Sequence, residues 1–267
     1  AYGYIVRMFN GDNISYALGD ASTAYCGISN IRLWKRSFEK YHLTQTPENG
    51  FGETPLKKYR RHIFLLHPNK VVIYDELEAN EKVRWDWLLH SPVKFDINPT
   101  ASILTTVNKE KGFSSVVQLF CEQEAAITQT DKYAAPPNHA DAQRGEDFTD
   151  PWSLTASFGP SRNNRILTII QVEADGRQAV QIMREGNTFR CGEWVIEAEL
   201  NAKRPGRLYI RNSRNNAVFS YGDKKPEING ELYSCKEKDA SVLFDCVNGE
   251  WMVQEMGDQR VQTMGKW

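Results

Sequence analysis

The stretch KYRRHIFLLHPNKVVIYDELEANEKVRWDWLLHSP, residues Lys58–Pro92, carries the clearest pattern in this sequence. Its first two apolar runs, Ile63–Leu66 and Val71–Tyr74, flank the tripeptide Pro-Asn-Lys, in which proline and asparagine adopt turn angles without strain. A third run, Val83–His90, alternates apolar and polar residues before its apolar end, and it follows the polar triplet Asn-Glu-Lys. The pattern predicts a meander of three antiparallel strands.

The first two of these strands are apolar on both faces, which is typical of a sheet covered on both sides. We therefore expect them in the middle of a large sheet. Along the rest of the chain, short apolar runs alternate with turn clusters and indicate roughly sixteen strands, without a sustained helical repeat. The predicted fold class is all-β, a large antiparallel multi-stranded β-sandwich. We expect one domain over residues 1–267, with room for a smaller β subdomain at about 190–267.

Three further segments lead to local expectations. A strand is predicted from Ile31 to Leu43, and the stretch Thr44–Pro55, with its two prolines and two glycines, is predicted to be a loop. The stretch Asp131–Pro151 is too long and polar for an ordinary connection, and such loops are usually functional or disordered. Its composition favours disorder.

Composition excludes several classes of function. The 267 residues carry 33 basic and 34 acidic side chains, a formal net charge of -1, so we expect no overall attraction to nucleic acid or to an anionic membrane. The sequence has no run of 18 apolar residues and no signal-peptide pattern at its start, and we expect it to begin inside a longer precursor. Of the five cysteines, Cys235 and Cys246 could bridge a hairpin, but free buried thiols are the favoured interpretation.

The histidines give no metal site. His62 and His67 lie five apart on one strand, so their side chains point to opposite faces and cannot share a metal. His139 and Asp141, in the long loop, form a pair without a third ligand. His90 ends the third predicted strand, where a polar tip at a sheet edge could face a cleft. For each single histidine, a structural role is favoured over catalysis.

Two adjacent arginines pose a problem of burial. Arg60 and Arg61 must point to opposite faces of their strand, so one of them enters a layer that is otherwise apolar. Such a guanidinium needs a carboxylate partner, which Asp75 or Asp20 could provide. A buried structural ion pair is the leading interpretation. The alternative is a guanidinium that grips a uronate or a sulfate.

Two tryptophans share one face of the third predicted strand. If Trp85 and Trp87 were exposed, they would form a flat platform on which sugar rings could stack. Two tryptophans on an alternating strand belong more often to a core.

Four segments of this chain together resemble a known family. They are YALGDASTAY (Tyr16–Tyr25), YRRHIFLLHP (Tyr59–Pro68), VVIYDE (Val71–Glu76) and WDWLLH (Trp85–His90). Their order resembles the C-terminal β-domain of heparinase II/III-like polysaccharide lyases, in which a GDAS-AY segment precedes an Arg-led strand, a hairpin with V-V-x-D-E and a W-x-L-H strand. The resemblance covers about Gly3–Pro92 and beyond it consists of all-β character alone.

The resemblance implies the β-domain of an enzyme that cleaves uronate-containing glycans, such as glycosaminoglycans, by β-elimination in the periplasm or outside the cell. Its partners would be the acidic polysaccharide and an N-terminal α/α toroid of the same protein. The family's catalytic Tyr and His, its His-x-His-x-Asp and His-Asn-Thr segments and its zinc site would lie upstream of Ala1. None of these positions transfers to this sequence, so we expect no metal, no cofactor and no lyase activity in this chain alone.

Two other classes of function remain open. One is a stand-alone carbohydrate-binding β-sandwich that uses Trp85 and Trp87 as its platform, and the other is a purely structural domain. If the chain closes a substrate cleft, the candidate residues are Asp20, Tyr25, Arg61, His62 and His90.

Overall fold

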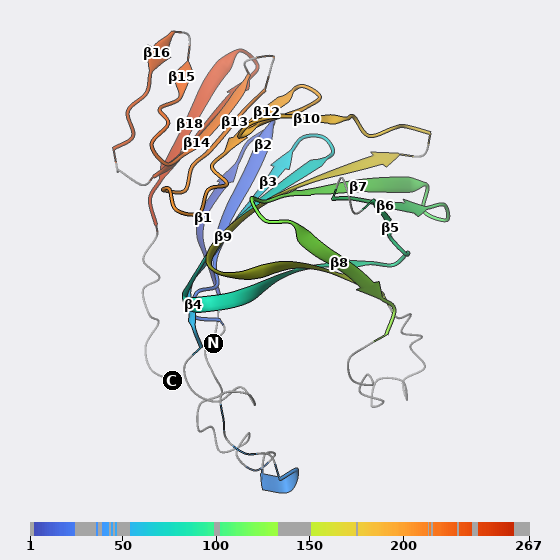
Figure 1. Ribbon diagram of the computed structural model, residues 1–267. Helices are drawn as coiled ribbons and strands as arrows, with labels where there is room; N and C mark the ends of the chain where they lie inside the picture. The colour runs from blue at the N-terminus through green and yellow to red at the C-terminus, as the bar shows by residue number, and fades with distance from the viewer. Residues whose placement is uncertain are drawn as a thin grey trace.

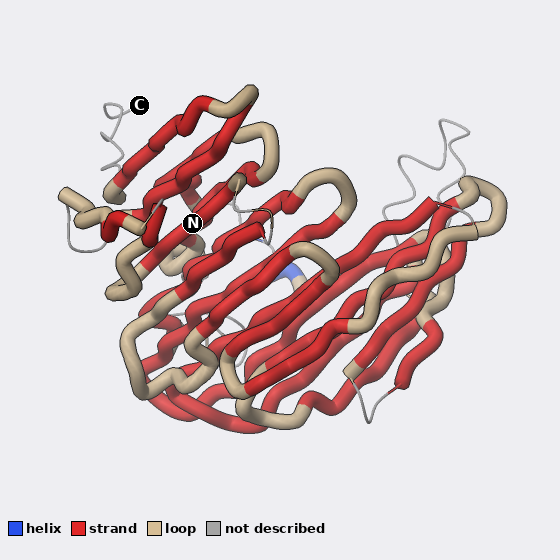
Figure 2. The backbone as a smooth tube through the Cα atoms, turned by 90° about the horizontal axis from the view of Figure 1, so that it is seen from above, coloured by secondary structure: helices blue, strands red, loops and turns tan. Residues whose placement is uncertain are grey.

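The protein is built almost entirely of antiparallel strands, as Figures 1 and 2 show for a computed structural model. The described part of the chain contains 18 strands in three sheets. The predicted all-β class and antiparallel layered architecture are therefore confirmed. The structure describes residues 3–24, 36, 39–42, 44, 46, 54–98, 102–132, 151–174, 176–212, 214, 216–228, 230–236 and 240–258.

The larger sheet has nine strands in the order β1-β2-β3-β4-β9-β7-β6-β5, with β8 paired to β9. The strands from β1 to β4 pair antiparallel in chain order, whereas β9 returns from far along the chain to lie between β4 and β7. The strands are β1 (Tyr4–Asn10), β2 (Ile14–Asp20), β3 (Leu56–Leu66), β4 (Lys70–Ser91), β5 (Asp96–Asn98), β6 (Ile103–Asn108), β7 (Phe113–Phe120), β8 (Ala125–Thr130) and β9 (Trp152–Ala174).

The second sheet has seven strands in the order β10-β11-β12-β13-β14-β17-β18, and β15 and β16 form a separate pair. It packs across one face of the larger sheet, here called the inner face (Figure 1). The predicted subdomain at about 190–267 stays a prediction. The strands are β10 (Ile182–Glu185), β11 (Thr188–Cys191), β12 (Trp194–Ala198), β13 (Leu208–Asn212), β14 (Ala217–Tyr221), β15 (Glu227–Ile228), β16 (Glu231–Leu232), β17 (Ser241–Val247) and β18 (Glu250–Met256).

The hairpin predicted from the central stretch is present. Strands β3 and β4 pair in register from Leu66 opposite Lys70 to Arg60 opposite Glu76, and they lie between β2 and β9 in the sheet. On the inner face, alternate side chains such as Phe64 are fully buried against the seven-stranded sheet. The central position of these two strands follows from that alternation.

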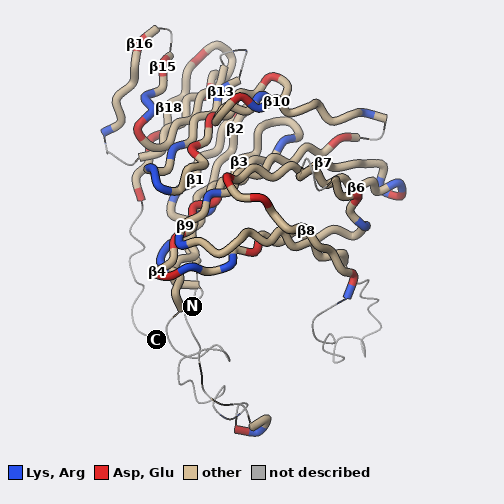
Figure 3. Tube along the Cα trace, viewed as in Figure 1, with Lys and Arg blue, Asp and Glu red and all other residues tan. Residues whose placement is uncertain are grey.

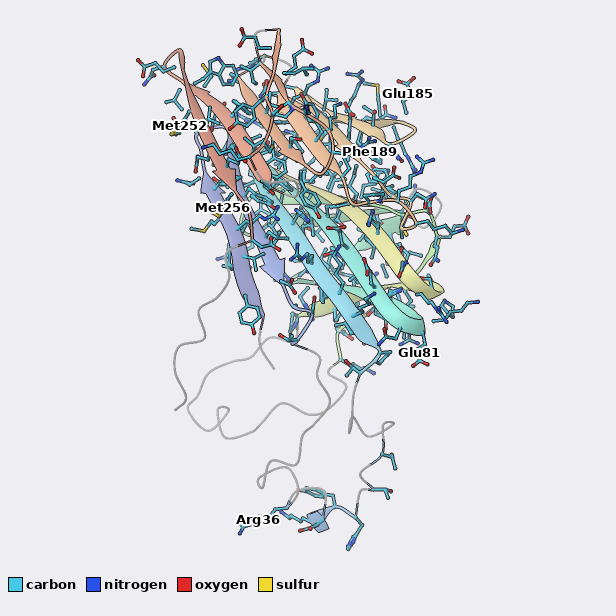
Figure 4. All side chains as sticks on the ribbon, turned by 90° about the vertical axis from the view of Figure 1, so that its left-hand side faces the viewer. Arg36, Glu81, Glu185, Phe189, Met252 and Met256 are labelled. Atoms are coloured by element: carbon cyan, nitrogen blue, oxygen red, sulfur yellow. The ribbon has the colours of Figure 1, made fainter. Side chains whose placement is uncertain are left out.

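The predicted third strand of the meander is wrong. The chain does not reverse at residues 80–82; instead β4 continues as one strand of 22 residues and bends there. Against β9, residues 79–82 lie opposite Arg162 alone, which is a bulge, and Gly159 and Pro160 follow close by on β9. The exposed polar residues 80–82, which indicated a turn, therefore mark a bend. Glu81 lies at one end of the long strands (Figure 4).

Coverage of both faces is only partial. On the face opposite the seven-stranded sheet, here called the outer face, Ile63 is 41% and Leu65 is 38% exposed. Farther along, the bent halves of β4 and β9 and the strand β8 fold over this outer face below β7 and β6 (Figure 1). That layer encloses a second core around Trp87, Leu119 and Phe158. The expectation of two covered faces thus holds at one end of the hairpin and fails at the other.

Other local expectations fall on segments that are described only in part. The strand predicted from Ile31 to Leu43 is wrong where that stretch is described, because Arg36, Glu39 and Lys40 have helical backbone. Most of the long Asp131–Pro151 stretch lies outside the described residues. In the described part, no helix is long and apolar enough to cross a membrane.

Candidate functional site

The two adjacent arginines each have a carboxylate partner, and they lie on opposite faces of the sheet. Arg60 Nε donates to Asp20 Oδ2 at 3.0 Å on the inner face. Arg61 Nε donates to Asp75 Oδ1 at 2.7 Å on the outer face. Both predicted partners are therefore used, one by each guanidinium.

A cleft of about 280 Å³ opens on the outer face where β4 bends away from β3. Its walls come from both halves of β4, because the bend brings the Trp85 region back over the hairpin. We call it the outer cleft. Aromatic and charged side chains in its lining include Tyr59, Arg61, Asp75, Trp85 and Trp87. Aliphatic side chains in the lining are Leu56, Leu77, Val83 and Ile166.

Two arginines line the outer cleft, and each is paired with an aspartate of the same lining: Arg84 with Asp86, and Arg61 with Asp75. Arg61 Nε and Nη2 hold the two oxygens of Asp75 at 2.7 and 2.9 Å, and the Arg61 guanidinium lies 5.6 Å from the ring centre of Tyr59. Both side chains line the cleft, but Asp75 is 1% exposed whereas Arg61 is 31% exposed, so the cation is the more accessible member of the pair. Burial raises the pKa of Asp75, and the nearby Arg61 opposes that shift.

Both tryptophans lie in the wall and not on an exposed platform. Trp85 is 9% and Trp87 is 3% exposed, because they point from β4 into the second core. The Trp85 indole N–H donates to the backbone oxygen of Ser161 at 3.2 Å. The platform interpretation is therefore corrected to the core interpretation, since the flat faces of these rings are covered by protein.

His62 is fully buried between the sheets and does not reach a cleft. Its Nδ1 lies 3.0 Å from the Tyr16 hydroxyl, and its Nε2 lies 3.4 Å from Glu76 Oε1. A neutral ring satisfies both contacts when Nδ1 accepts from the tyrosine and Nε2 donates to the carboxylate. Burial lowers the pKa of His62, although Glu76 opposes the shift, which agrees with a neutral imidazole. His62 is therefore no longer a candidate for contact with substrate.

The other cleft candidates do not gather around Arg61. Asp20 lies on the inner side with Arg60; burial opposes its charge, but hydrogen bonds from Ser22 and Arg60 outweigh that effect and lower its pKa. His90 is exposed near the far end of β4, opposite Ser153. Tyr25 lies outside the described residues.

Metal-ligand and disulfide chemistry find no support in the described part of the chain. No three His, Cys, Asp or Glu side chains there come together in an arrangement that could hold a metal ion. Cys235 and Cys246 are both free thiols.

Sequence reasoning missed the residues that surround Glu76. Tyr221 donates to Glu76 Oε1 at 2.8 Å, and Arg165 Nη2 lies 3.3 Å from Glu76 Oε2. Tyr221 and Arg165 lie far along the chain from Glu76, on β14 and β9. The sequence carries no signal for this cluster, because the partners of Glu76 depend on pairings that cross more than 85 residues.

Comparison with known proteins gives similarity of fold. No family model and no curated protein matches the chain. Among solved structures, the heparan sulfate lyase HepC from Pedobacter heparinus has a TM-score of 0.47 and 6% identity, over 80% of this chain and 26% of its own. One structure of heparinase III has a TM-score of 0.48 and 10% identity, over 80% of this chain and 26% of its own. Another has a TM-score of 0.44 and 11% identity, over 92% of this chain and 27% of its own.

These solved proteins are lyases of the kind that the sequence resembles. The chain spans about a quarter of their length (26% and 27%). A likeness at such identities and TM-scores concerns the arrangement of strands and says nothing about chemistry.

Proposed function

We propose that this chain is the β-domain of a polysaccharide lyase that cleaves a uronate-containing glycan by β-elimination. The observation that carries the proposal is the meeting of the lyase-like segments on three neighbouring strands. The GDAS segment ends β2, the YRRH segment lies on β3 and the YDE segment lies on β4. Ion pairs join them, Asp20 with Arg60 and Arg61 with Asp75.

The outer cleft has the chemistry that an acidic sugar requires. Elimination removes a weakly acidic proton beside a carboxylate, so the negative charge that develops there must be stabilised. Arg61 presents a guanidinium, fixed by Asp75, next to the aromatic ring of Tyr59 and the apolar side of the cleft. A planar cation beside apolar walls suits a sugar ring that carries a carboxylate.

The proton-transfer groups belong to another part of the enzyme in this proposal. An α/α toroid upstream supplies the base, the acid and any zinc site, and this domain closes one side of the cleft. The chain alone is therefore inactive. Because such glycans are extracellular polymers, the enzyme works in the periplasm or outside the cell.

The alternative function, a stand-alone carbohydrate-binding module, lacks the exposed aromatic platform that it requires. That function needed Trp85 and Trp87 at the surface, and they are 9% and 3% exposed. The exposed apolar side chains Ile63 and Leu65 on the outer face of β3 are aliphatic, and they offer no flat ring for stacking.

The proposal is tested in the complete enzyme with a neutral version of the Arg61 pair. The double variant Arg61→Met with Asp75→Asn removes both charges and leaves no buried acid unpaired. We expect its KM for heparan sulfate, chondroitin sulfate or alginate to rise about tenfold or more, as loss of a charged hydrogen bond predicts. An unchanged KM with a normal melting temperature contradicts a role of Arg61 in binding substrate.

A further inference from the structure

On the inner face of β3, β4 and β9, the layer between the sheets changes from apolar to charged. Side chains on alternate β3 positions pass from Phe64 through His62 to Arg60 and Lys58. Arg60 lies opposite Glu76 on β4, and Glu76 lies opposite Arg165 on β9. Basic and acidic segments gather around the neighbouring strands β4 and β9 (Figure 3).

Glu76 is the acid at the centre of this row. Its Oε2 lies 3.3 Å from both Lys58 Nζ and Arg165 Nη2, and it is 1% exposed. Burial raises the pKa of such a carboxyl, but the hydrogen bond from His62 and the charges of Lys58 and Arg165 outweigh it, and the pKa of Glu76 is lowered. The carboxylate is thus fully compensated by its neighbours.

Arg165 keeps unused hydrogen-bonding capacity. The residue is 5% exposed, and its Nη2 pairs with Glu76, but its buried Nη1 has no hydrogen-bond partner among the described residues. A buried guanidinium nitrogen without an acceptor costs free energy, and a bound anion would recover that cost.

A cavity of about 540 Å³ adjoins this side chain, between the inner face of β3, β4 and β9 and the loop after β12. We call it the inner cavity. It lies on the opposite face of the sheet from the outer cleft. Its volume is within the range of pockets that hold small organic ligands.

The loop that closes the inner cavity is fitted closely to it. A Cβ at Gly206 would overlap the Glu76 carboxylate. Gly222 has a φ of +92°, and a Cβ there would lie 2.6 Å from the backbone oxygen of Gly206. Glycine at both positions lets two backbone segments approach each other and the acid. The loop then places Lys203 and Arg204, both exposed, at the rim.

Cations outnumber acids in the lining of the inner cavity, although Arg204 also pairs with Glu199 at 3.5 Å and Arg60 with Asp20 at 3.0 Å, outside the lining. Five cations line the cavity, and the three acids in the lining are Glu76, Glu78 and Asp258. All three acids are in ion pairs, because Lys58 approaches both glutamates and Arg60 and Arg7 hold Asp258. The same pairs disfavour a metal cation. The cations that line the cavity are Lys58, Arg60, Arg165, Lys203 and Arg204.

We propose that the inner cavity binds an oxyanion, the sulfate or carboxylate group of an acidic sugar, with Arg165 at its floor and Lys203 and Arg204 at its rim. The anion accepts from Arg165 Nη1, and the rim cations attract the rest of a charged ligand. This site is separate from Arg61, and its binding is measured on this chain without any lyase activity. Failure of either proposal therefore leaves the other intact.

Inorganic sulfate is the first probe. Calorimetric titration with sodium sulfate, against sodium chloride at equal ionic strength, is expected to give saturable binding. The double variant Lys203→Ala with Arg204→Ala should weaken it about tenfold or more. The matched control, Lys109→Ala with Lys111→Ala, removes the same charge from an exposed turn and should leave it unchanged. Equal affinity in the two double variants, or no saturable binding by the wild type, overturns the site.

Arg165 is tested separately because its removal leaves the negative charge of the buried Glu76 without one of its cationic partners. Arg165→Gln should abolish sulfate binding while far-ultraviolet circular dichroism stays native. If this variant fails to fold, the rim variant and its control still decide the question.

Oligosaccharides then identify the source of the anion. Retention of sulfated heparan oligosaccharides, or of alginate oligosaccharides that carry only carboxylates, assigns the group on the sugar. Binding of inorganic sulfate without retention of either sugar overturns the sugar assignment.

Discussion

The Arg61 guanidinium donates two hydrogen bonds to Asp75, from Nε at 2.7 Å and from Nη2 at 2.9 Å. The aspartate is 1% exposed and the arginine 31%, so one cation both balances a buried acid and faces a cleft. Its neighbour Arg60 points to the opposite face, where it pairs with Asp20 and Asp258. A single dipeptide therefore provides charge to the outer cleft and to the inner cavity.

Removal of Arg61 alone should destabilise the fold. Arg61→Met leaves the buried Asp75 without its partner, and breaking a fully buried pair costs about 3–5 kcal/mol. Because Arg61 is partly exposed, we expect a loss of about 2–3 kcal/mol in the free energy of unfolding, measured with urea at neutral pH. Adding Asp75→Asn should restore most of it. A single variant as stable as the wild type would show that the pair contributes nothing to folding.

Acid should destabilise the protein in two ranges of pH. The pKa of His62 is lowered by burial, so the unfolded chain takes up a proton near its usual pKa of 6.5 while the folded chain does not, and stability falls as pH drops below that value. The pKa of Glu76 is also lowered, and its contribution is lost below its usual 4.5. Asp75, whose pKa is raised, acts in the opposite direction.

Urea unfolding across pH 7 to 5 tests the histidine part. His62→Gln should flatten the dependence in this range and leave the fall below the usual glutamate pKa. An unchanged slope in the variant would show that His62 is not the group that titrates.

Gly206 should tolerate no side chain. Gly206→Ala places a methyl group against the Glu76 carboxylate, and overpacking of this kind costs about 1–3 kcal/mol. Gly159→Ala is the matched control, because a Cβ there meets nothing within 4 Å. Thermal unfolding of the two variants should differ by several degrees. Equal melting temperatures would mean that the loop is not packed on Glu76.

The tryptophans should matter for folding and not for sugar stacking. Trp87→Ala should cost about 3–5 kcal/mol, as for other large-to-small changes in a core. The neighbouring Leu88 is 54% exposed, and Leu88→Ala should change stability by about 0.5 kcal/mol or less. Chemical unfolding measures both. A stable Trp87→Ala protein that loses retention on neutral glycans would restore the platform interpretation.

Local alternation was enough to predict the hairpin and one ion pair, of Arg60 or Arg61 with Asp75 or Asp20. Residues two apart on a strand share a face, so the sequence alone required that Arg60 and Arg61 diverge and that the one in the apolar layer find an acid. In the structure, both arginines have an acid as partner.

The sequence also indicated a break at residues 80–82. Whether that break is a turn or a bend depends on β9, which begins at Trp152. The pairing of Glu78 with Asn163 and of Val83 with Ser161 settles it.

The inner cavity could not be predicted because its parts come from four distant segments. Lys58, Glu76 and Arg165 meet through β3, β4 and β9, and the rim at Lys203 comes from the loop after β12. Each looks like an ordinary surface charge in the sequence. Their convergence depends on how the two sheets stack, a property of the whole fold.

The central claim, that this chain is one domain of a lyase for acidic glycans, is tested most directly by the appearance of unsaturated uronate product. Heparan sulfate, chondroitin sulfate and alginate are incubated with this chain alone and with the longer protein of the proposal, in which an α/α toroid precedes this chain. The ultraviolet absorbance of the new C=C bond is followed. The account predicts product from the longer protein and none from the chain alone. Product from the chain alone, or none from the longer protein on any acidic glycan, would contradict it.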